Sequence, residues 1–504
     1  MSVCKPRFLL CSSGSSSTDS DALKHVVSEL PSLLSKDAVV TFPWDARWDD
    51  LQIRAASPRI SPDYSIIVEA ATEDDVQKTV SLANRFDIPF LAVSGGHGWT
   101  RSLNQLPYGI QINLRKLNTT TLNPDGKTAI VGGGTKQYEI TRSLFGLGKY
   151  AVTGLSQCVS VAGPLLGGGH SLLQGQYGYS VDGLVSARVV LASGEIVEAS
   201  RTKNSDLFWA LQGAGHNFGI VTSLEMKTYD IPSEWTVYTF MFSSDKVEAL
   251  FTLVNELEDL GVQRPAKLAL TGLFIRIPAV DSVNARLTIP KPIVIYNVAY
   301  EGSEAEAEPY AARFTALGPI STQIHTNVNY VELYTVTGNL LTDRPCTSNE
   351  NILGAGVSLP AWDIQGVRKA LTIFGEITAD PRFNTSITLM ENYGMQGVRA
   401  IDAASTALAP EERDLPILAS AVLWWAGEDE ETTKVAQDYL HAMTDALYMG
   451  VDGDSNKKRH CYVNYASGEE SRSEVYGESR LKKLAELKSK WDPENKFKYY
   501  NPIV

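Results

Sequence analysis

The feature that most constrains the fold of this 504-residue chain is the run Ser94-Gly95-Gly96-His97-Gly98, which directly follows the apolar stretch Pro89–Val93. A short apolar stretch that ends in glycines predicts a strand followed by a turn. Glycine adopts backbone conformations that other residues avoid, so a large planar ligand can approach the main chain closely there. The run therefore predicts a turn that presents one imidazole, His97, to a bound ligand.

Two further motifs strengthen this interpretation. A second glycine cluster covers Gly163–His170, and the motif Tyr462-Val463-Asn464-Tyr465 lies near the C-terminus. One glycine cluster alone is usually only a tight turn, so the interpretation depends on the three motifs together. Glycine-rich turns present amide N–H groups to phosphate oxygens without intervening side chains. A Rossmann fingerprint would need a glycine at the last position of Gly213–Phe218, so the pattern favours FAD over NAD.

The chain divides by pattern into an N-terminal tail and three folded parts. Residues 1–35, which include a serine-rich stretch, are expected to be a flexible tail. Residues 36–232 alternate short apolar runs with glycine turns, which predicts strands at 65–69, 90–93, 109–114 and 128–131. Thr72 can cap a helix in which Val76, Val80 and Ala83 recur at helical spacing, so this region begins as strand, helix, strand.

The middle of the chain, residues 233–455, has a different pattern. Longer β-rich runs at 235–240, 268–275 and 292–296 alternate with helical patches near 308–317 and 362–374. This pattern predicts an antiparallel sheet covered by helices on one face. Residues 456–504 then form a closing segment, with a helix containing Leu481, Leu484 and Leu487 that ends at Trp491-Asp492-Pro493. The predicted fold class is α+β, with two domains.

Composition excludes several classes of function. The net charge of −13 leaves no basic stripe for nucleic acid or for an anionic membrane surface. No stretch is apolar enough to span a bilayer, and the N-terminal apolar run is too short for a signal peptide, which favours an intracellular protein. The five cysteines are too scattered for a disulfide framework, and no Cys-x-x-Cys pair suggests a metal.

The three motifs, in this order, resemble those of the vanillyl-alcohol oxidase superfamily of covalent-flavin oxidoreductases, and within it the berberine bridge enzyme-like branch. The resemblance covers about residues 40–230 and 455–504 well, and the middle only in general character. Supporting motifs are Pro62, Asp75-Val76-Gln77, Gly132–Thr135, Tyr177–Asp182, Asp206–Leu211 and Phe218–Thr222. The resemblance implies a two-part FAD-binding domain (PCMH-type), formed by residues 36–232 and 456–504, and a substrate domain between them.

The resemblance also implies that FAD is bonded to a ring nitrogen of His97. Many relatives attach the flavin a second time through a cysteine eleven residues before the triple glycine, where this chain has Ser156. A serine hydroxyl stays protonated near neutral pH, so a single attachment is expected, with Cys158 a buried free thiol. Besides His97, the expected cofactor-binding residues are Ser94, Gly95, Gly96, Gly98, Ser156, Val159, Gly163, Gly168, Gly169, Gly219, Val221 and Asn464. His170 and His216 follow glycine clusters, and either flavin contact or backbone hydrogen bonding would explain them.

The implied reaction is hydride transfer from a substrate carbon to flavin N5, with Tyr465 as catalytic base. Val159 stands where oxidases of the family carry valine or isoleucine, so reoxidation by molecular oxygen to give hydrogen peroxide is expected. The expected substrate is a small secondary-metabolite alcohol, phenol or amine, with oxidative cyclisation as one outcome. Candidate pocket residues are Tyr462, Glu391, Tyr393 and His325, although strand alternation alone does not say which face each occupies.

Other functions remain open at this point. Residues 411–414 stand where many relatives carry a His-Arg pair, so no substrate carries over from a relative. A flavin-containing cyclase without redox chemistry, a carbohydrate oxidase and a non-catalytic binding protein are the alternatives, and the fold alone does not choose among them.

Overall fold

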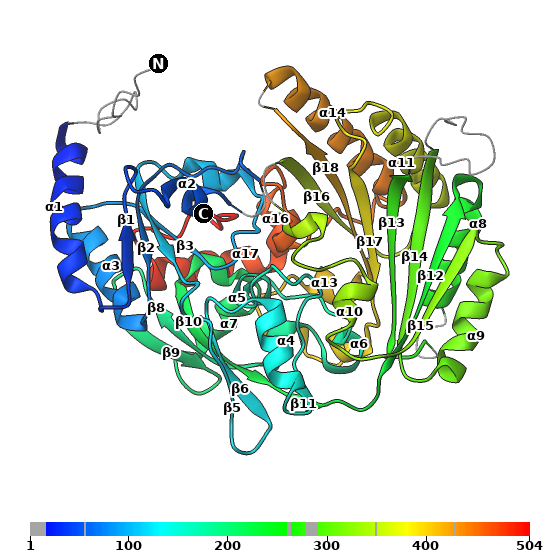
Figure 1. Ribbon diagram of the computed structural model, residues 1–504, viewed down its shortest axis with the longest axis horizontal. Coiled ribbons are helices and arrows are strands. Elements are labelled where there is room, and N and C mark those ends of the chain that lie inside the picture. The colour runs from blue at the N-terminus through cyan, green and yellow to red at the C-terminus, as the bar shows by residue number, and fades with distance from the viewer. Residues whose placement is uncertain (1–16, 55–56, 260–263, 278–290, 348–349, 428) are drawn as a thin grey trace.

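The computed structural model describes residues 17–504 except 55–56, 260–263, 278–290, 348–349 and 428. Figure 1 shows two parts side by side. One part contains the N-terminal segments together with the C-terminal helices, and the other is built around a large sheet from the middle of the chain. Segments distant in sequence therefore meet both within the first part and along the boundary between the two.

The first part contains two main sheets and a short strand pair. The four-stranded sheet has the order β1 (Val39–Thr41), β2 (Tyr64–Glu69), β4 (Gly109–Asn113), β3 (Phe90–Val93). In it β2, β4 and β3 run parallel, and β1 is antiparallel to β2. The five-stranded antiparallel sheet has the order β5 (Thr120–Leu122), β6 (Thr128–Gly132), β10 (Ile220–Lys227), β8 (Leu184–Val190), β9 (Ile196–Ser200). Strand β11 (Tyr229–Asp230) pairs with β7 (Lys149–Tyr150).

Helix α3 (Glu73–Arg85) shows how the sequence builds the support of the His97 turn. Thr72 caps its N-terminus by accepting a hydrogen bond from the amide of Asp75, and the Asp75 side chain bonds back in a capping box. Val76, Val80 and Ala83 are completely buried on the face toward the sheet. The predicted sequence of strand, helix and strand is confirmed, and β3 ends at Val93, immediately before the glycine turn.

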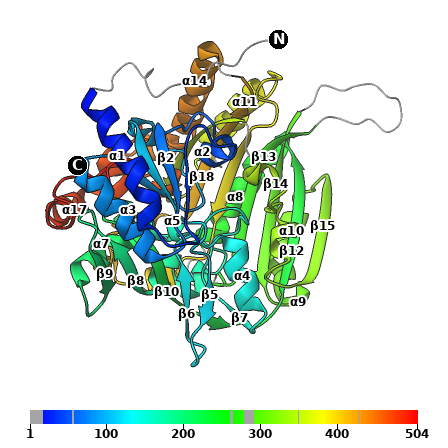
Figure 2. The same ribbon diagram turned by 60° about the vertical axis from the view of Figure 1, so that its left-hand side comes forward.

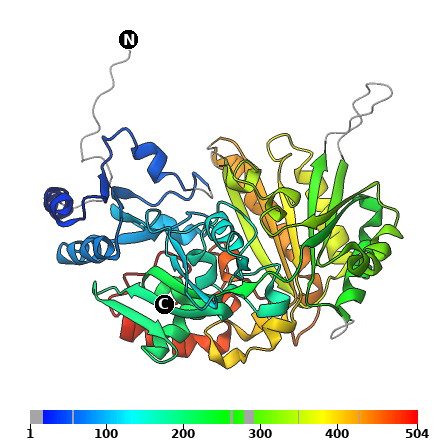
Figure 3. The same ribbon diagram turned by 60° about the horizontal axis from the view of Figure 1, so that its bottom comes forward.

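The C-terminal segment packs against the N-terminal part. Helix α17 (Glu478–Trp491), as predicted from the leucine spacing, contacts α7 (Ser205–Ala214). Figure 3 shows these last helices lying beneath the strands of the first part. The remaining helices of this region are α1 (Ser17–Leu33), α2 (Trp48–Gln52), α4 (Gln137–Phe145), α5 (Ala162–Leu166), α6 (Gln174–Tyr177) and α16 (Arg472–Tyr476).

The second part is built on a seven-stranded, wholly antiparallel sheet. Its order is β15 (Ser321–Val328), β12 (Trp235–Ser243), β14 (Lys291–Glu301), β13 (Leu268–Ile277), β17 (Ile387–Asn392), β18 (Ile417–Trp425), β16 (Asn351–Leu359). Figure 2 shows β15 at the outer edge of this sheet. Because β17 and β18 lie near the opposite edge, residues on them are far in strand order from residues on β15.

Helices cover one face of this sheet, as predicted. They are α8 (Val247–Asp259), α9 (Glu304–Thr315), α11 (Ile364–Ile377) and α14 (Glu430–Leu447), and shorter helices are α10 (Leu333–Val336), α12 (Gln396–Arg399), α13 (Pro410–Asp414) and α15 (Met449–Asp452). The core between helices and sheet is aromatic, with Phe251 edge-on to Phe274, Tyr296 and Trp362. Burial of this many large rings supplies a strong apolar driving force for the layer.

The expected flexible tail is wrong for residues 17–33. Residues 17–33, which were expected to belong to a flexible tail, form helix α1. Leu23, Val26 and Leu30 are buried, and the helix packs against α3. Their spacing of three and four residues is the signal that the serine-rich composition obscured. Residues 1–16 of the expected tail lie outside the described residues.

None of the helices in the described part of the chain has the length and apolar character needed to cross a bilayer.

Candidate active site

The turn that carries His97 is held by packing from two distant segments. A Cβ atom at Gly95 would lie 2.7 Å from the amide nitrogen of Ser160, and one at Gly98 would lie 2.5 Å from the ring of Tyr500. Gly96 has a φ of +74°, a conformation that side chains disfavour. Ser94 donates its hydroxyl hydrogen to the carbonyl of Gly133 at 2.7 Å. The glycines of the motif are thus required by the protein's own packing and backbone geometry.

His97 itself presents a free imidazole nitrogen. Its Nε2 is buried and has no hydrogen-bond partner among the described residues. Burial, together with the positive charges of Lys136 and Arg54, lowers the pKa of His97 to about 4. The ring is therefore neutral at physiological pH, and a neutral imidazole nitrogen is a nucleophile.

The main chain of this turn is also unpaired. The amides of Gly95, Gly96, His97 and Gly98 donate to no backbone or side-chain acceptor among the described residues. The nine residues Leu91–Trp99 are all only half-buried. The buried guanidinium of Arg54 bonds the carbonyl of Gly98 at 3.3 Å and forms no salt bridge within the described chain. Free amides beside unpaired positive charge fit the pyrophosphate of FAD, and the free nitrogen of His97 fits a bond to its flavin.

The triple glycine lies against the C-terminal motif. Gly168 and Gly169 have φ angles of +123° and +85°. The amide of Gly169 donates to the hydroxyl of Tyr462 at 2.9 Å. The side-chain amide of Asn464 donates to the carbonyl of Pro164 at 2.9 Å and to the Tyr462 hydroxyl at 2.6 Å. Asn464 and Tyr462 therefore fix the glycine loop to the C-terminal segment.

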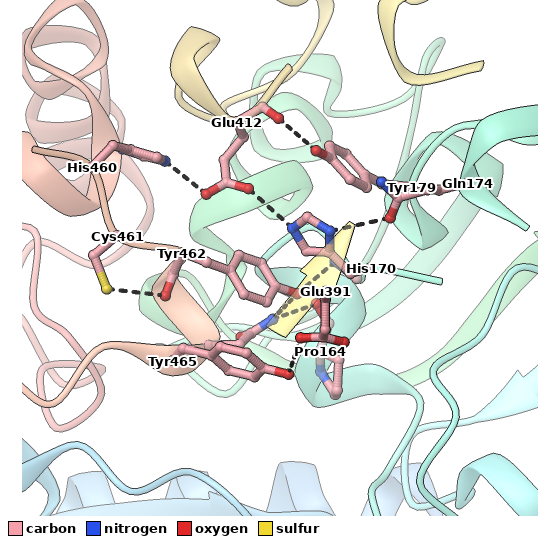
Figure 4. Close-up of polar contacts among 12 residues, drawn as sticks. Pro164, His170, Gln174, Tyr179, Glu391, Glu412, His460, Cys461, Tyr462 and Tyr465 are labelled. Atoms are coloured by element: carbon pink, nitrogen blue, oxygen red, sulfur yellow. Dashed lines mark hydrogen bonds and ion pairs between the residues drawn. The ribbon is translucent and has the colours of Figure 1, made fainter. Parts of the chain in front are cut away.

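Tyr465 meets Glu391 across the boundary between the two parts. Its hydroxyl donates to Oε2 of Glu391 at 2.9 Å (Figure 4). The Tyr393 hydroxyl donates to Oε1 of the same carboxylate. Glu391 is near the end of β17, and Tyr465 is in the 3₁₀ turn Val463–Tyr465. Trp99, just after the His97 turn, donates from its indole nitrogen to the carbonyl of Tyr465 at 3.1 Å. The predicted residues Tyr465, Glu391 and Tyr393 thus form one hydrogen-bonded group close to the His97 turn, in which Glu391 and Tyr393 are buried and Tyr465 is half-buried.

Burial governs the acid–base properties of this group. Burial raises the pKa of Glu391 above its ordinary value, although the hydrogen bonds from the tyrosines and the charge of His170 partly oppose the shift. Burial and the neighbouring carboxylate raise the pKa of Tyr465 well above that of an ordinary phenol. A carboxylate with a raised pKa is a stronger base than an exposed one, which makes Glu391 a candidate proton acceptor.

A second buried group lies beside the first, and no sequence motif indicated it. Helix α13 places Glu412 between two imidazoles, with Nε2 of His170 3.2 Å from Oε2 and Nε2 of His460 2.7 Å from Oε1. The next residue, Arg413, pairs with Asp182 of the first part at 2.7 Å, and both side chains are at least 96% buried. Residues 411–414 therefore join the two parts through buried charges. Their partners lie between 48 and 242 residues away in sequence, which sequence patterns do not reveal.

The expectation that Cys158 is a free thiol is wrong. Cys158 forms a disulfide with Cys346, 188 residues later in the chain. The hydroxyl of Ser156 lies 3.5 Å from the sulfur of Cys158 and 3.6 Å from that of Cys346. Five scattered cysteines did not indicate this pairing because the fold, not the spacing, brings the two residues together.

The remaining predicted residues fall into two groups. Gly163, Val159, Gly219 and Val221 lie in the first part: the carbonyl of Gly163 bonds His216 at 2.8 Å, and Val159 is half-buried. Gly219 and Val221 are packed against β8 and Gly133. His325, by contrast, lies on the edge strand β15 and is exposed, four positions in strand order from β17. The expectation that His325 shares a pocket with Glu391 is wrong, because period-two alternation gives no information on strand order.

Comparison with known sequences agrees with this geometry. A family model described as "FAD binding domain" matches residues 64–200, and one described as "Berberine and berberine like" matches residues 461–504. The chain is 34% identical over 482 residues to the FAD-linked oxidoreductase chyH of Penicillium rubens, which covers 94% of this chain and 93% of that protein. It is 34% identical over 492 residues to the FAD-linked oxidoreductase chry5 of Gibberella zeae, with coverage of 94% and 93%.

Solved structures share the fold at lower identity. Chitooligosaccharide oxidase superposes with a TM-score of 0.79 at 19% identity, covering 96% of this chain and 99% of that one. Glucooligosaccharide oxidase from Acremonium strictum, whose FAD is 6-S-cysteinyl and 8α-N1-histidyl, gives a TM-score of 0.79 at 19% identity, with coverage of 95% and 98%. Fold and sequence together define an FAD-linked oxidoreductase. The chain belongs to the berberine bridge enzyme-like family of FAD-linked oxidoreductases.

Proposed function

We propose that this FAD-linked oxidoreductase is an oxidase of small secondary-metabolite alcohols, phenols or amines, in which Tyr465 and Glu391 remove the substrate proton. The observation that carries the proposal is the hydrogen bond from the hydroxyl of half-buried Tyr465 to Oε2 of buried Glu391. Bound FAD would supply the acceptor for the hydride of the substrate carbon, and oxygen would be the final electron acceptor, with hydrogen peroxide as its reduced product.

The proton path follows from the two pKa shifts. Tyr465 is too weak an acid to be deprotonated at neutral pH, because burial and the adjacent carboxylate raise the pKa of its hydroxyl. It acts instead as a relay: its oxygen takes the proton from the substrate hydroxyl or amine while its own proton passes to Oε2 of Glu391. Burial raises the pKa of Glu391, which makes this carboxylate a better proton acceptor near neutral pH. Tyr393, bonded to the other oxygen, fixes the orientation of the carboxylate.

A single covalent attachment through His97 is part of the proposal. The lowered pKa of His97 leaves its ring neutral, and its buried Nε2 has no competing hydrogen bond. Neither of the two residues at the expected position of a second flavin attachment supplies a thiolate. Ser156 carries a hydroxyl, and the sulfur of Cys158 is bonded to Cys346. A covalent bond raises the effective concentration of the cofactor at the site and withdraws electron density from its ring system.

Val159 supports reoxidation by oxygen. Its amide bonds the carbonyl of Ser156 at 3.3 Å, and its own carbonyl accepts from the amide of Gln137 at 2.9 Å, so the backbone of this loop is held on both sides. A small β-branched side chain at this half-buried position leaves more room than leucine would. Oxidative ring closure of the product is compatible with this chemistry when the oxidised substrate carries an internal nucleophile.

The test begins with the holoenzyme under anaerobic conditions. Candidate metabolites are added, and loss of the yellow flavin absorbance is followed; oxygen is then admitted and peroxide is measured. Bleaching followed by stoichiometric peroxide supports an oxidase, and reoxidation without peroxide contradicts it. A cyclase without redox chemistry would convert a substrate with no bleaching of the flavin. A non-catalytic binding protein would leave both the flavin absorbance and the small molecule unchanged.

The covalent attachment has its own test, which needs no substrate. Acid precipitation of the wild-type holoenzyme should leave yellow colour in the pellet, whereas the His97→Ala variant should release all flavin to the supernatant. His441→Gln, at an exposed imidazole paired with Glu469, is the matched control and should retain the pellet colour. Release of flavin from the wild type would overturn the proposed bond.

A further inference from the structure

His170 lies between two hydrogen-bond acceptors. Its Nε2 is 3.2 Å from the carboxylate of Glu412, and its Nδ1 is 3.1 Å from Oε1 of Gln174. Oε1 of Gln174 also accepts from the amide of Ser171 at 3.2 Å, and Nε2 of Gln174 is directed at the sulfur of Met395. Rotating the Gln174 amide would bring two donors together at Ser171, so the oxygen stays toward His170. Both ring nitrogens of His170 must therefore carry hydrogens to satisfy their partners.

The partner imidazole of this cluster differs. His460 donates from Nε2 to Glu412, but its Nδ1 is buried without a partner among the described residues. One ring hydrogen satisfies the hydrogen bonding of His460. Hydrogen bonds from the two imidazoles hold the carboxylate of Glu412 ionised against the opposing effect of its burial, and its pKa falls to about 2. A single buried anion thus faces two imidazoles, of which only His170 has acceptors on both sides.

The other groups around His170 are aromatic or already neutralised. The rings of Tyr179 and Tyr462 pack edge-on to its imidazole at 4.7 and 4.6 Å between centroids, and Tyr393 lies at 6.2 Å. The hydroxyl of Tyr179 donates to the backbone carbonyl of Glu412. The neighbouring charges of Arg413 and Asp182 form a closed pair. In Figure 4 His170 lies between Glu412 on one side and Glu391 with Tyr465 on the other.

We propose that His170 is a positioning residue that donates hydrogen bonds from both ring nitrogens and, with Glu412 as its counter-ion, keeps Glu391 in the ionised form that accepts the proton of Tyr465. The inference rests on the proposed function, since it assigns His170 a role toward that acid–base pair. Burial would otherwise protonate Glu391, and the positive charge of His170 opposes that effect. Glu412, on the far side of the imidazole, holds the charge in place without acting on Glu391 directly.

The first experiment measures the protonation of His170 in the holoenzyme. The seven histidines are labelled with ¹⁵N in the ring, and the His170 resonances are assigned by their loss in the His170→Gln variant. Both nitrogens of His170 should show attached protons from pH 6 to about pH 8, while His460 should show one. A His170 ring with one unprotonated nitrogen at neutral pH would overturn the proposal.

The second experiment measures the ionisation of Glu391 without any substrate. The infrared carbonyl band of its protonated carboxyl is assigned by its loss in Glu391→Gln and is titrated with pH. In His170→Gln the titration should move upward by about one pH unit or more, because a neighbouring positive charge is lost. In His170→Lys it should return close to the wild-type position, since an ammonium group offers hydrogens to both acceptors and restores the charge.

The controls separate the role of charge from that of packing. His441→Gln removes an exposed imidazole and should leave the Glu391 titration unchanged. Equal shifts in His170→Gln and His170→Lys would mean that His170 only packs, and no shift in either would mean that its charge does not act on Glu391; both results overturn the proposal. Because neither measurement uses substrate, a failure of anaerobic flavin reduction would contradict the proposed function alone.

Discussion

The His97 turn and the proposed catalytic wall, formed by Glu391, Tyr393, Tyr465, Glu412, His170 and His460, differ in the groups from which they are built. At the turn, the groups offered to a ligand are backbone amides and one neutral imidazole, and the glycines are required by close packing against Ser160 and Tyr500. In the wall, buried carboxylates, imidazoles and phenols satisfy one another across the boundary between the two parts. Backbone recognition can be encoded in five consecutive residues, whereas a buried charge needs a partner that the fold must supply. Substitutions should therefore affect cofactor loading at the turn and chemistry or stability at the wall.

The largest effect should come from the acid–base pair of the wall. Tyr465→Phe and Glu391→Gln should each slow anaerobic flavin reduction by about 10²- to 10⁴-fold, because each removes the proton path. The double variant should be little worse than either single one, since the two groups act as one unit. Tyr439→Phe, at a half-buried tyrosine of α14, is the control.

The same pair should give the wild-type rate its dependence on pH. Only the ionised form of Glu391 accepts a proton, and burial raises its pKa. The rate should therefore fall as the pH drops through that raised pKa, and the acid limb should lie above the ordinary range of a glutamate. Stopped-flow reduction measured across pH tests this, and a pH-independent rate would contradict the assignment of Glu391.

The next effect concerns the buried ion pair between Arg413 and Asp182, which joins the two parts of the molecule. Arg413→Met leaves the carboxylate of Asp182 buried and unpaired, and should lower the free energy of unfolding by about 3–5 kcal/mol. Adding Asp182→Leu should recover most of this loss, because no unpaired charge remains. Arg313→Met, at an exposed pair with Glu256, should change the denaturant midpoint little. A comparable loss in both arginine variants would remove the distinction between buried and surface charges.

The disulfide should contribute a somewhat smaller stabilisation. Replacing Cys158 and Cys346 by serine opens a loop of 188 residues and should cost about 2–4 kcal/mol, chiefly through the entropy of the unfolded chain. Dithiothreitol should lower the melting temperature of the wild type to that of the double variant and leave the variant itself unchanged. An unaltered melting temperature of the wild type in reducing buffer would show that this disulfide does not stabilise the protein.

The smallest effect should be at the turn, and it should appear in cofactor content. In Gly95→Ala the new Cβ meets the backbone of Ser160, so the turn must shift at a cost of about 1–3 kcal/mol. The ratio of flavin to protein absorbance should fall. Gly146→Ala is the matched control, because Gly146 has a φ of −60° and only ordinary contacts beyond 3.5 Å. Normal flavin content in Gly95→Ala would contradict the view that packing shapes the cofactor turn.

Local patterns predicted local structure well. The Thr72 cap and the buried stripe of α3, the leucine spacing of α17 and the β-rich runs of the middle region all formed the expected elements. These features succeed because capping and amphipathic periodicity act within one or two turns of chain. The prediction of a flexible tail was wrong for helix α1, because the serine-rich composition was given more weight than the apolar stripe of Leu23, Val26 and Leu30.

Local sequence patterns did not predict the pairings between residues that are distant in sequence. Cys158 and Cys346, His170 and Glu412, and Arg413 and Asp182 are each separated by more than 180 residues. His325 and Glu391 sit on strands with similar patterns, yet one strand is the exposed edge of the sheet and the other lies inside it. Alternation sets the two faces of a strand but gives no information about its neighbours.

The sequence by itself determined the cofactor side of this protein: a glycine turn carrying His97, a triple-glycine loop and a Tyr-x-Asn-Tyr segment, each a contiguous motif whose geometry follows from backbone freedom. Only the tertiary structure decided the chemical side, where Glu391 reaches Tyr465, and Glu412 reaches His170 and His460. The physical reason is that ionisable groups become useful when buried, and a buried charge is stable only beside partners that folding brings from distant parts of the chain.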